Sequence, residues 1–218
     1  MKNKQENSFW PSYTDLMTSL FFIMLVLYVL TYVRLSSTIK LQKEKLAIIE
    51  TVEENLKPLK KDTSLFVYEE KYKRFKLSFD VNFFTNKSGI NHNELVNYSS
   101  TIAKIDQAGI KLKNIIDNLY NTKNSNPKLK NVSYILVIAG YASKTGDEFH
   151  NYKLSYERAL ALRNHWRSKG IDFESKKYQD LVDLQISGNG EGGVGRELID
   201  IHNQRFLIQI FPKIGDIK

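Results

Sequence analysis

An ionisable residue at the edge of a long apolar run is the first candidate for chemistry in this chain. From Leu16 to Val33 the sequence runs eighteen residues without a charge, and Asp15 directly precedes them. A carboxylate carried into a bilayer costs about 2.5–3.5 kcal/mol at mid-depth, so it tends to face protein or water, as functional carboxylates do. An interfacial Asp15 in a first helical turn, stabilised by the helix dipole, is the alternative. The residues alone support both interpretations.

Two other patterns suggest chemistry, but their surroundings do not support it. Gly188–Gly193 matches GxGxxG after a predicted strand, yet a short polar stretch follows in place of the helix that a dinucleotide site needs. His92, His150, His165 and His202 lack ligand spacing, and the chain has no cysteine, so we expect no metal site. No nucleophile elbow, P-loop or pair of catalytic carboxylates occurs. We therefore expect neither an enzyme nor a cofactor.

The segment that positions Asp15 is Phe9–Val33, which we predict to be a single transmembrane helix. Eighteen helical residues span roughly 27 Å, close to the ~30 Å hydrocarbon core of a bilayer. Trp10 lies where an interfacial aromatic belt is expected, and Tyr28 and Tyr32 approach the other interface. A secretory signal is disfavoured, because the apolar run is long and no small-residue cleavage site follows it.

The charges around this span indicate an orientation. Residues 1–8 form a short polar head that carries Lys2 and Lys4. More basic residues follow the span: Arg34, Lys40, Lys43 and Lys45. By the positive-inside rule this bias points the C-terminus inward.

Residues 34–60 read as a charged helix with two open interpretations. A heptad register places apolar residues at five of seven seam positions. The seam is Leu35, Ile39, Gln42, Leu46, Ile49, Glu53 and Leu56. Such a seam supports a parallel dimer, and a solvated amphipathic linker that ends at Pro58 fits equally well.

Residues 61–218 have the length of one ordinary domain, in which strands alternate with helices. We expect strands at 65–68, 75–81, 132–139, 181–187 and 206–211, and helices at 94–121 and 155–169. Apolar residues alternate with polar ones in the second strand, as in a half-buried strand. The predicted fold class is α+β, a sandwich in which helices cover one face of a mixed sheet.

The composition bears on two questions, whether the chain binds nucleic acid and in which redox compartment it resides. The net charge of +8 permits binding to nucleic acid, but the basic residues are spread along the chain. No RNP, zinc-finger or helix-turn-helix signature accompanies them, so nucleic acid is not an expected partner. The absence of cysteine leaves the redox compartment open.

The residues around Asp15 resemble the membrane helix of a known family. Trp10, Tyr13, Leu16 and Thr18, followed by the apolar tail, are similar to the B subunits of ion-driven rotary motors. This family includes the flagellar stator protein MotB and the ZorB subunit of Zorya anti-phage systems. The resemblance implies that Asp15 carries the coupling ion, H⁺ or Na⁺. It also implies that two such helices sit inside a ring of MotA-like or ZorA-like A subunits.

The same resemblance implies a topology. It places residues 1–8 in the cytoplasm and residues 61–218 in the periplasm, the reverse of the charge bias, and we give the resemblance precedence. Residues 34–60 would then be either a plug that blocks ion flow before assembly or a dimeric neck. Both remain open.

Two further stretches resemble OmpA-like peptidoglycan-binding domains. Gly140–Arg158, GYASKTGDEFHNYKLSYER, is similar to their signature of a strand ending in Gly-aromatic/His-Thr-Asp, then Asn, Leu-Ser and an Arg-Ala pair. Gly188–Glu191 and Asn203–Arg205 are similar to a second part of that family's pattern. The resemblance covers roughly residues 75–212. It implies an OmpA-like sandwich that binds peptidoglycan.

Carried over residue by residue, the resemblance defines a pocket. Arg158 would pair with the free carboxylate of the peptidoglycan stem peptide, a group that suits its planar fork. Asn151, Leu154 and Ser155 would shape the same pocket. Ser143 stands where the family usually has Asp, so the acidic group for the ammonium of the stem peptide is missing at that position.

A structural role for Arg158 is the alternative. Asp147 and Glu148 precede it and offer a salt bridge at the start of the predicted helix. An arginine near a helix N-terminus opposes the helix dipole, which favours the ligand role.

The sequence thus predicts the B subunit of a proton- or sodium-driven rotary motor in a bacterial inner membrane, anchored to peptidoglycan. Zorya-type defence is favoured because the head is short and the chain compact. A flagellar-type stator is the alternative within the family, and a passive OmpA-like wall tether without ion transport is the alternative of another class. The expected partners are an A-subunit ring, a second copy of the chain, peptidoglycan and the membrane.

Overall fold

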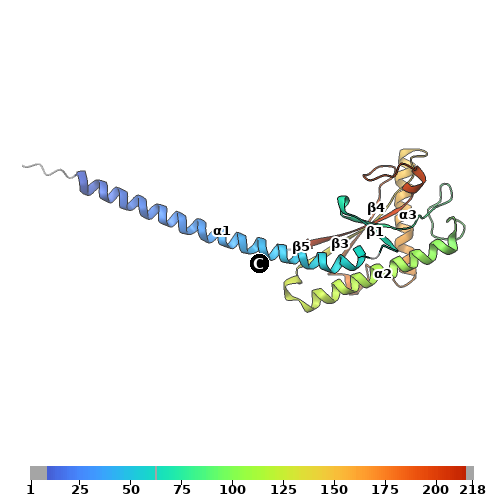
Figure 1. Ribbon diagram of the computed structural model, residues 1–218, viewed down its shortest axis with the longest axis horizontal. Coiled ribbons are helices and arrows are strands. Elements are labelled where there is room, and N and C mark those ends of the chain that lie inside the picture. Colours follow the sequence, from blue (N-terminus) through green and yellow to red (C-terminus); the bar gives the residue numbers. More distant parts are fainter. Residues whose placement is uncertain (1–8, 62, 215–218) are drawn as a thin grey trace, which may run out of the picture. The chain divides into compact units, whose positions relative to one another are not determined.

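The computed structural model describes residues 9–61 and 63–214, which fall into two compact units divided between Ala47 and Ile48. The first unit contains the N-terminal part of helix α1 (Phe9–Lys61). The second contains the last turns of α1 and a sheet domain (Figure 1). Residues 1–8, the predicted head, lie outside the described residues, and so does the side chain of Trp10.

Helix α1 is apolar on all sides from Leu16 to Val33. Between Leu16 and Val33 its large apolar side chains are 42–68% exposed. The hydroxyls of Thr18 and Thr31 donate to backbone carbonyls one turn earlier, which satisfies them in apolar surroundings. The helix is long and apolar enough to cross a membrane, so it is a candidate span.

The domain is built on a mixed sheet with the strand order β1-β2-β5-β3-β4. The strands are β1 (Phe66–Glu69), β2 (Arg74–Leu77), β3 (Val132–Gly140), β4 (Val182–Gly188) and β5 (Phe206–Ile214). Helix α2 (Tyr98–Ser125) joins β2 to β3, and α3 (Glu148–Ser168) joins β3 to β4. The crossover through α3 makes β3 and β4 parallel, whereas the other pairs are antiparallel. Short 3₁₀ turns lie in the connections: η1 (Glu70–Tyr72), η2 (Pro127–Leu129), η3 (Lys176–Tyr178) and η4 (Asp200–Asn203).

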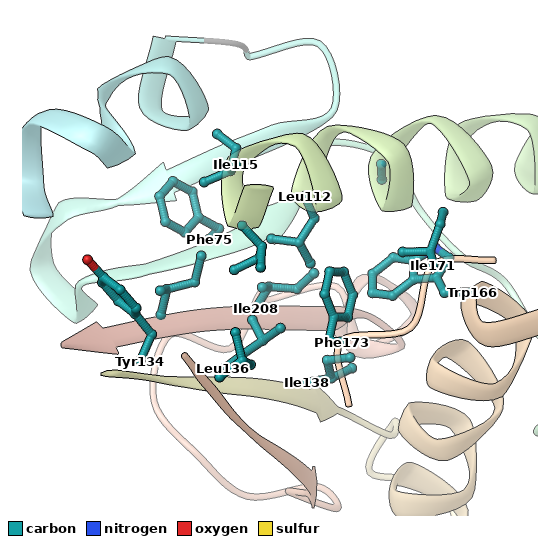
Figure 2. Close-up of a cluster of buried hydrophobic side chains, with 14 of the residues drawn as sticks. Phe75, Leu112, Ile115, Tyr134, Leu136, Ile138, Trp166, Ile171, Phe173 and Ile208 are labelled. Atoms are coloured by element: carbon teal, nitrogen blue, oxygen red, sulfur yellow. The ribbon is translucent and has the colours of Figure 1, made fainter. Parts of the chain in front are cut away.

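The core lies between one face of the sheet and the two helices (Figure 2). Every second residue of β3 from Val132 to Ile138 is buried, while the residues between them are half-buried. Trp166 of α3 is fully buried, and its indole N–H donates to the carbonyl of Ile105 on α2 at 2.9 Å. This bond ties the two helices into one layer. The predicted α+β sandwich, with helices on one face of a mixed sheet, is confirmed.

Helix α2 begins at Tyr98, four residues later than predicted. The carboxylate of Glu94 is occupied by a loop, where it accepts from the backbone N–H of Gly89 and Ser88 and from the amide of Asn91. These hydrogen bonds, the one from Gly89 first, lower the pKa of Glu94. Because Glu94 closes this loop, it does not belong to the first turn of the helix.

Helix α3 begins at Glu148, seven residues earlier than predicted. Asp147 caps it, because its carboxylate accepts from the backbone N–H of His150 at 2.9 Å. The sequence analysis considered Asp147 as a salt-bridge partner of Arg158 and not as a helix cap. The earlier start places the whole predicted pocket segment from Asn151 onward on a single helix.

The last turns of α1 contribute to the domain core. Ile48 and Leu56 are both only 7% exposed and belong to the main hydrophobic cluster. Leu56 is also the last seam position of the predicted heptad, whereas Leu46 and Ile49 are 56% and 38% exposed. The compact unit thus begins at Ile48, within the segment predicted to be a linker.

Candidate functional site

One face of α3 carries four of the predicted site residues. Asn151, Leu154, Ser155 and Arg158 are all buried, with exposed fractions of 7% or less. Their spacing of three and four residues places them on the same side of the helix. The structure therefore brings these four together, as the resemblance implied.

Arg158 is a buried cation without an acidic partner. Its side chain donates from Nε to the carbonyl of Lys87 at 3.1 Å and from Nη1 to the carbonyl of Tyr141 at 3.4 Å. The guanidinium also lies 4.3 Å from the ring centre of Phe83. Among the described residues no carboxylate lies within ion-pair distance of it, so Asp147 and Glu148 do not neutralise it. Burial lowers the pKa of Arg158 to about 10, which still leaves it charged at neutral pH.

The helix-dipole argument for Arg158 does not hold. That argument placed Arg158 near the start of its helix, whereas α3 runs from Glu148 to Ser168 and puts Arg158 in its middle. The case for a ligand role therefore depends on burial and the missing acidic partner, not on the dipole.

Two loops from the ends of parallel strands complete the site. Gly140 pairs with Gly188 at the end of β3 and β4, and the pairing continues because the N–H of Ala142 donates to the carbonyl of Gly190 at 2.9 Å. The N–H of Gly190 in turn donates to the hydroxyl of Ser155 at 2.8 Å. This hydroxyl therefore holds the loop after β4 against α3.

Glycine is required where these loops approach α3. A Cβ built on Gly140 would lie 2.1 Å from the carbonyl oxygen of Ser155. Gly190 has a φ of +54°, and a Cβ there would lie 2.9 Å from the ring of Tyr152. Gly188 and Gly190 of the GxGxxG pattern thus allow close packing on α3, and Gly193 lies against the ring of Tyr141. These contacts explain the pattern without a dinucleotide.

Ser143 lies half-buried in the loop after β3, beside this site. The next residue, Lys144, donates its backbone N–H to the carboxylate of Asp200 at 2.8 Å. Asp200 also accepts from Arg196 at 3.1 Å, so its charge is already paired.

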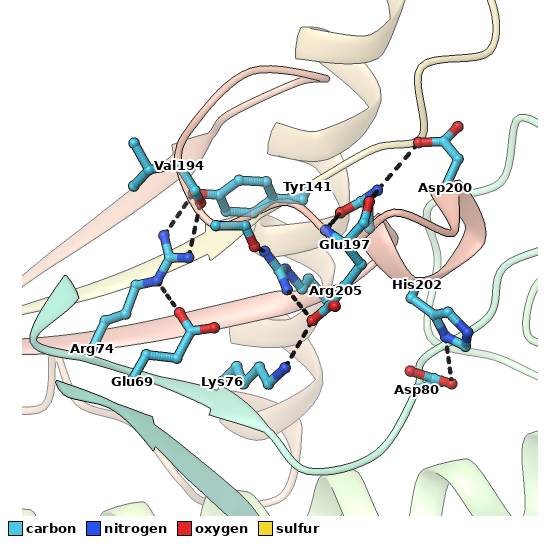
Figure 3. A network of polar contacts seen from close by, with 12 residues as sticks. Glu69, Arg74, Lys76, Asp80, Tyr141, Val194, Glu197, Asp200, His202 and Arg205 are labelled. Carbon is cyan, nitrogen blue, oxygen red and sulfur yellow. Dashed lines mark hydrogen bonds and ion pairs between the residues drawn. The ribbon is translucent and has the colours of Figure 1, made fainter. Parts of the chain in front are cut away.

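A network of arginines supports the site from the other side of the sheet (Figure 3). Arg74 donates to Glu69 at 2.5 Å, to the hydroxyl of Tyr141 at 3.4 Å and to the carbonyl of Val194 at 2.9 Å. Arg205 donates to Glu197 at 3.4 Å. Tyr141 connects this network to the site on α3, because its hydroxyl accepts from Arg74 and its carbonyl accepts from Arg158. The sequence analysis assigned no role to Arg74, Tyr141 or Arg205, although the charged residue Arg74 at the start of a strand was a visible signal.

Asp15, the other predicted functional residue, lies in the first unit. Its side chain is exposed on α1, two residues after Tyr13 and directly before the apolar run. The structure thus places Asp15 and the α3 residues in separate compact units.

Comparisons with known proteins give similarities of limited extent. The chain matches no family model. It is 26% identical over 92 residues to outer membrane protein A of Buchnera aphidicola subsp. Schizaphis graminum, a match that covers 42% of this chain and 25% of that protein. The chain therefore corresponds to only about a quarter of the length of this relative.

Similarity to solved structures is also limited, as two examples show. The OmpA-like domain of FopA1 from Francisella tularensis subsp. tularensis SCHU S4 is 20% identical, with a TM-score of 0.37 and coverage of 68% of this chain and 79% of that one. A MotB-like protein from Desulfovibrio vulgaris is 13% identical, with a TM-score of 0.42 and coverage of 78% and 98%.

Proposed function

We propose that the domain of residues 48–218 binds peptidoglycan and that Arg158 binds a free carboxylate of its stem peptide. The observation that carries the proposal is the buried guanidinium, which contacts two carbonyls and an aromatic ring but no carboxylate among the described residues. An unpaired buried charge is costly, and a ligand carboxylate would offset that cost. The resemblance of Gly140–Arg158 to the OmpA-like signature supports the same ligand.

The neighbouring residues have roles that follow from their positions. Asn151 and Ser155 lie on the same buried face as Arg158 and hold the loop after β4 by hydrogen bonds. Leu154 is buried on that face. Ser143 offers a hydroxyl to the ligand but no charge. The domain then acts by binding, not by catalysis.

We further propose that the whole chain is the B subunit of an ion-driven rotary motor of the bacterial inner membrane, with the domain in the periplasm. The support is the aspartate next to the apolar run of α1 and its resemblance to that family. In this proposal two copies sit in a ring of A subunits, and Asp15 binds and releases H⁺ or Na⁺. The energy scale is adequate, since one charge gains about 2.3 kcal/mol per 100 mV. Neighbouring genes distinguish the uses: helicase or nuclease genes indicate Zorya-type defence, and flagellar genes indicate a stator.

Binding to purified sacculi tests the role of Arg158. The full-length protein in detergent should co-sediment with sacculi, and Arg158→Ala should weaken this about ten- to a hundredfold, because a charge-assisted hydrogen bond is lost. Arg158→Lys keeps the charge but not the planar fork of the guanidinium, so its affinity for sacculi should lie between those of the wild type and Arg158→Ala. Arg167→Ala is the matched control, since Arg167 lies on the same helix with a side chain that is 55% exposed.

Thermal unfolding of each variant separates binding from folding. Wild-type affinity in a folded Arg158→Ala variant would refute the proposed site. If Arg158→Ala does not fold, the Arg158→Lys variant decides in its place. Wild-type protein that is folded yet does not sediment would show that the partner of the domain is not peptidoglycan.

A further inference from the structure

The loop after β4 carries a carboxylate and faces the loop that carries Ser143. Past the strand ends, the N–H of Asn189 donates to the carbonyl of Gly140 and the N–H of Ala142 to that of Gly190. Glu191 follows in a turn, in which the N–H of Gly192 donates to the carbonyl of Asn189 at 2.9 Å, and Ser143 follows Ala142 in the facing loop. The sequence analysis did not assign a role to Glu191.

Glu191 is held in place but not neutralised. Its Oε2 accepts from the side-chain amide of Asn151 at 3.1 Å, and Asn151 is itself only 2% exposed. Within the described part of the chain no basic side chain lies within ion-pair distance of Glu191. The nearby acids differ, because Asp200 pairs with Arg196 and Glu197 pairs with Lys76 and Arg205.

One buried face of α3 thus carries an unpaired cation, Arg158, and through Asn151 it holds an unpaired anion, Glu191, from the loop after β4. Asn151 positions Glu191, and Arg158 lies two turns further along α3. Side chains on a helix lean toward its N-terminus, so the long side chain of Arg158 extends back toward the turn of Asn151. Its bond to the carbonyl of Tyr141, two residues before Ser143, agrees with this direction.

We propose that Glu191 binds the ammonium group of the ligand whose carboxylate is bound by Arg158. The ligand is then an amino-acid end with both a free carboxylate and a free ammonium, which matches the two charges of the site. This inference rests on the proposed binding of peptidoglycan, whose stem peptides contain such ends. Glu191 provides, from a different strand end, the negative charge that Ser143 lacks.

Sacculi with blocked amines test this assignment. Treatment with acetic anhydride converts free ammonium groups to neutral amides and leaves the carboxylates unchanged. The full-length wild type should bind acetylated sacculi about ten- to a hundredfold more weakly than native ones. Glu191→Gln keeps the acceptor for Asn151 and should therefore fold, but it should bind native sacculi with a similar loss. The variant should be nearly insensitive to acetylation, because the pair is already broken.

The control and the competing outcomes are distinct. Asp183→Asn removes an exposed carboxylate of β4, and it should respond to acetylation like the wild type. Glu191→Gln could instead bind native sacculi with wild-type affinity and lose as much affinity as the wild type when the sacculi are acetylated. The assignment of Glu191 would then be wrong, while the role of Arg158 would stand. If the folded wild type binds neither preparation, the proposed function fails, and this inference fails with it.

Discussion

Asp15 and Arg158 are the two ionisable residues on which the proposed function depends. Within the described residues, Arg158 is buried among groups of its own domain, whereas Asp15 is exposed. Arg158 is 3% exposed and contacts carbonyls and a ring from other parts of its own domain. Asp15 is exposed, and the apolar side chains that follow it on α1 are exposed on every side. The environment of Arg158 is therefore set by folding, whereas in the proposed function that of Asp15 is supplied by a membrane and by other chains.

Substitution of Asp15 has the largest expected effect. Asp15→Asn preserves the size of the side chain but removes the carboxylate that binds the ion in the proposed function, so all motor-dependent activity should be lost. Membrane insertion and binding to sacculi should stay unchanged, since the domain is a separate compact unit. The measurement is phage protection or motility in cells, beside co-sedimentation of the purified protein.

Two variants control this experiment. Asp15→Glu keeps a carboxylate and should retain part of the activity, and Asp183→Asn should retain all of it. Full activity in Asp15→Asn would leave the chain as a passive tether and would remove the contrast between the two residues.

The second prediction concerns the position along α1 at which the compact domain begins. Leu46 and Leu56 lie on the same helix, but Leu46 is 56% exposed and Leu56 only 7%. Leu56→Ala should lower the free energy of unfolding of the domain by about 2–5 kcal/mol, as for a buried leucine. Leu46→Ala should change it by less than about 0.5 kcal/mol, as for a surface site.

Urea unfolding of the full-length protein in detergent measures both values. The fluorescence of buried Trp166 reports on the domain when Trp10, the other tryptophan, is replaced by Phe. Equal small effects of the two substitutions would indicate that the domain begins after residue 56, close to the predicted boundary at residue 61.

The sequence predicted the elements best where one local pattern decides. The apolar runs at 132–139 and at Leu16–Val33 are single local patterns, and they form β3 and part of α1 as predicted. The starts of α2 and α3 were wrong because single side chains decide them. Glu94 closes a loop, and Asp147 caps a helix. Asp147 followed by Glu148 was a readable signal for a helix start.

The site could be predicted only in part. The residues from Asn151 to Arg158 share one helix face, so a local motif was enough to group them. Lys87 lies 71 residues away in sequence from Arg158, and no period or motif relates the two positions. The hydrogen bond between Asn151 and Glu191 likewise joins positions that lie 40 residues apart in sequence. Contacts of this kind arise from the tertiary fold.

The smallest expected effect concerns an aspartate that the domain does surround, in contrast to Asp15. Asp117 on α2 accepts from the hydroxyl of Tyr178 at 2.6 Å, from Lys113 at 2.9 Å and from Lys177. Burial alone would raise the pKa of Asp117, but these hydrogen bonds hold it well below its usual range. Because the folded pKa is lower than the unfolded one, the stability from Asp117 is present above about pH 4 and is lost as the pH falls further.

Asp117→Asn should therefore lower the free energy of unfolding by about 1.5–3 kcal/mol at pH 7, the range for hydrogen bonds to a charged group. Its difference from the wild type should shrink when urea unfolding is repeated at pH 3, where the unfolded wild type takes up the proton. Asp183→Asn, at an exposed position, should show no such change between the two pH values. An equal deficit of Asp117→Asn at both pH values would mean that packing, not charge, stabilises this contact between α2 and η3.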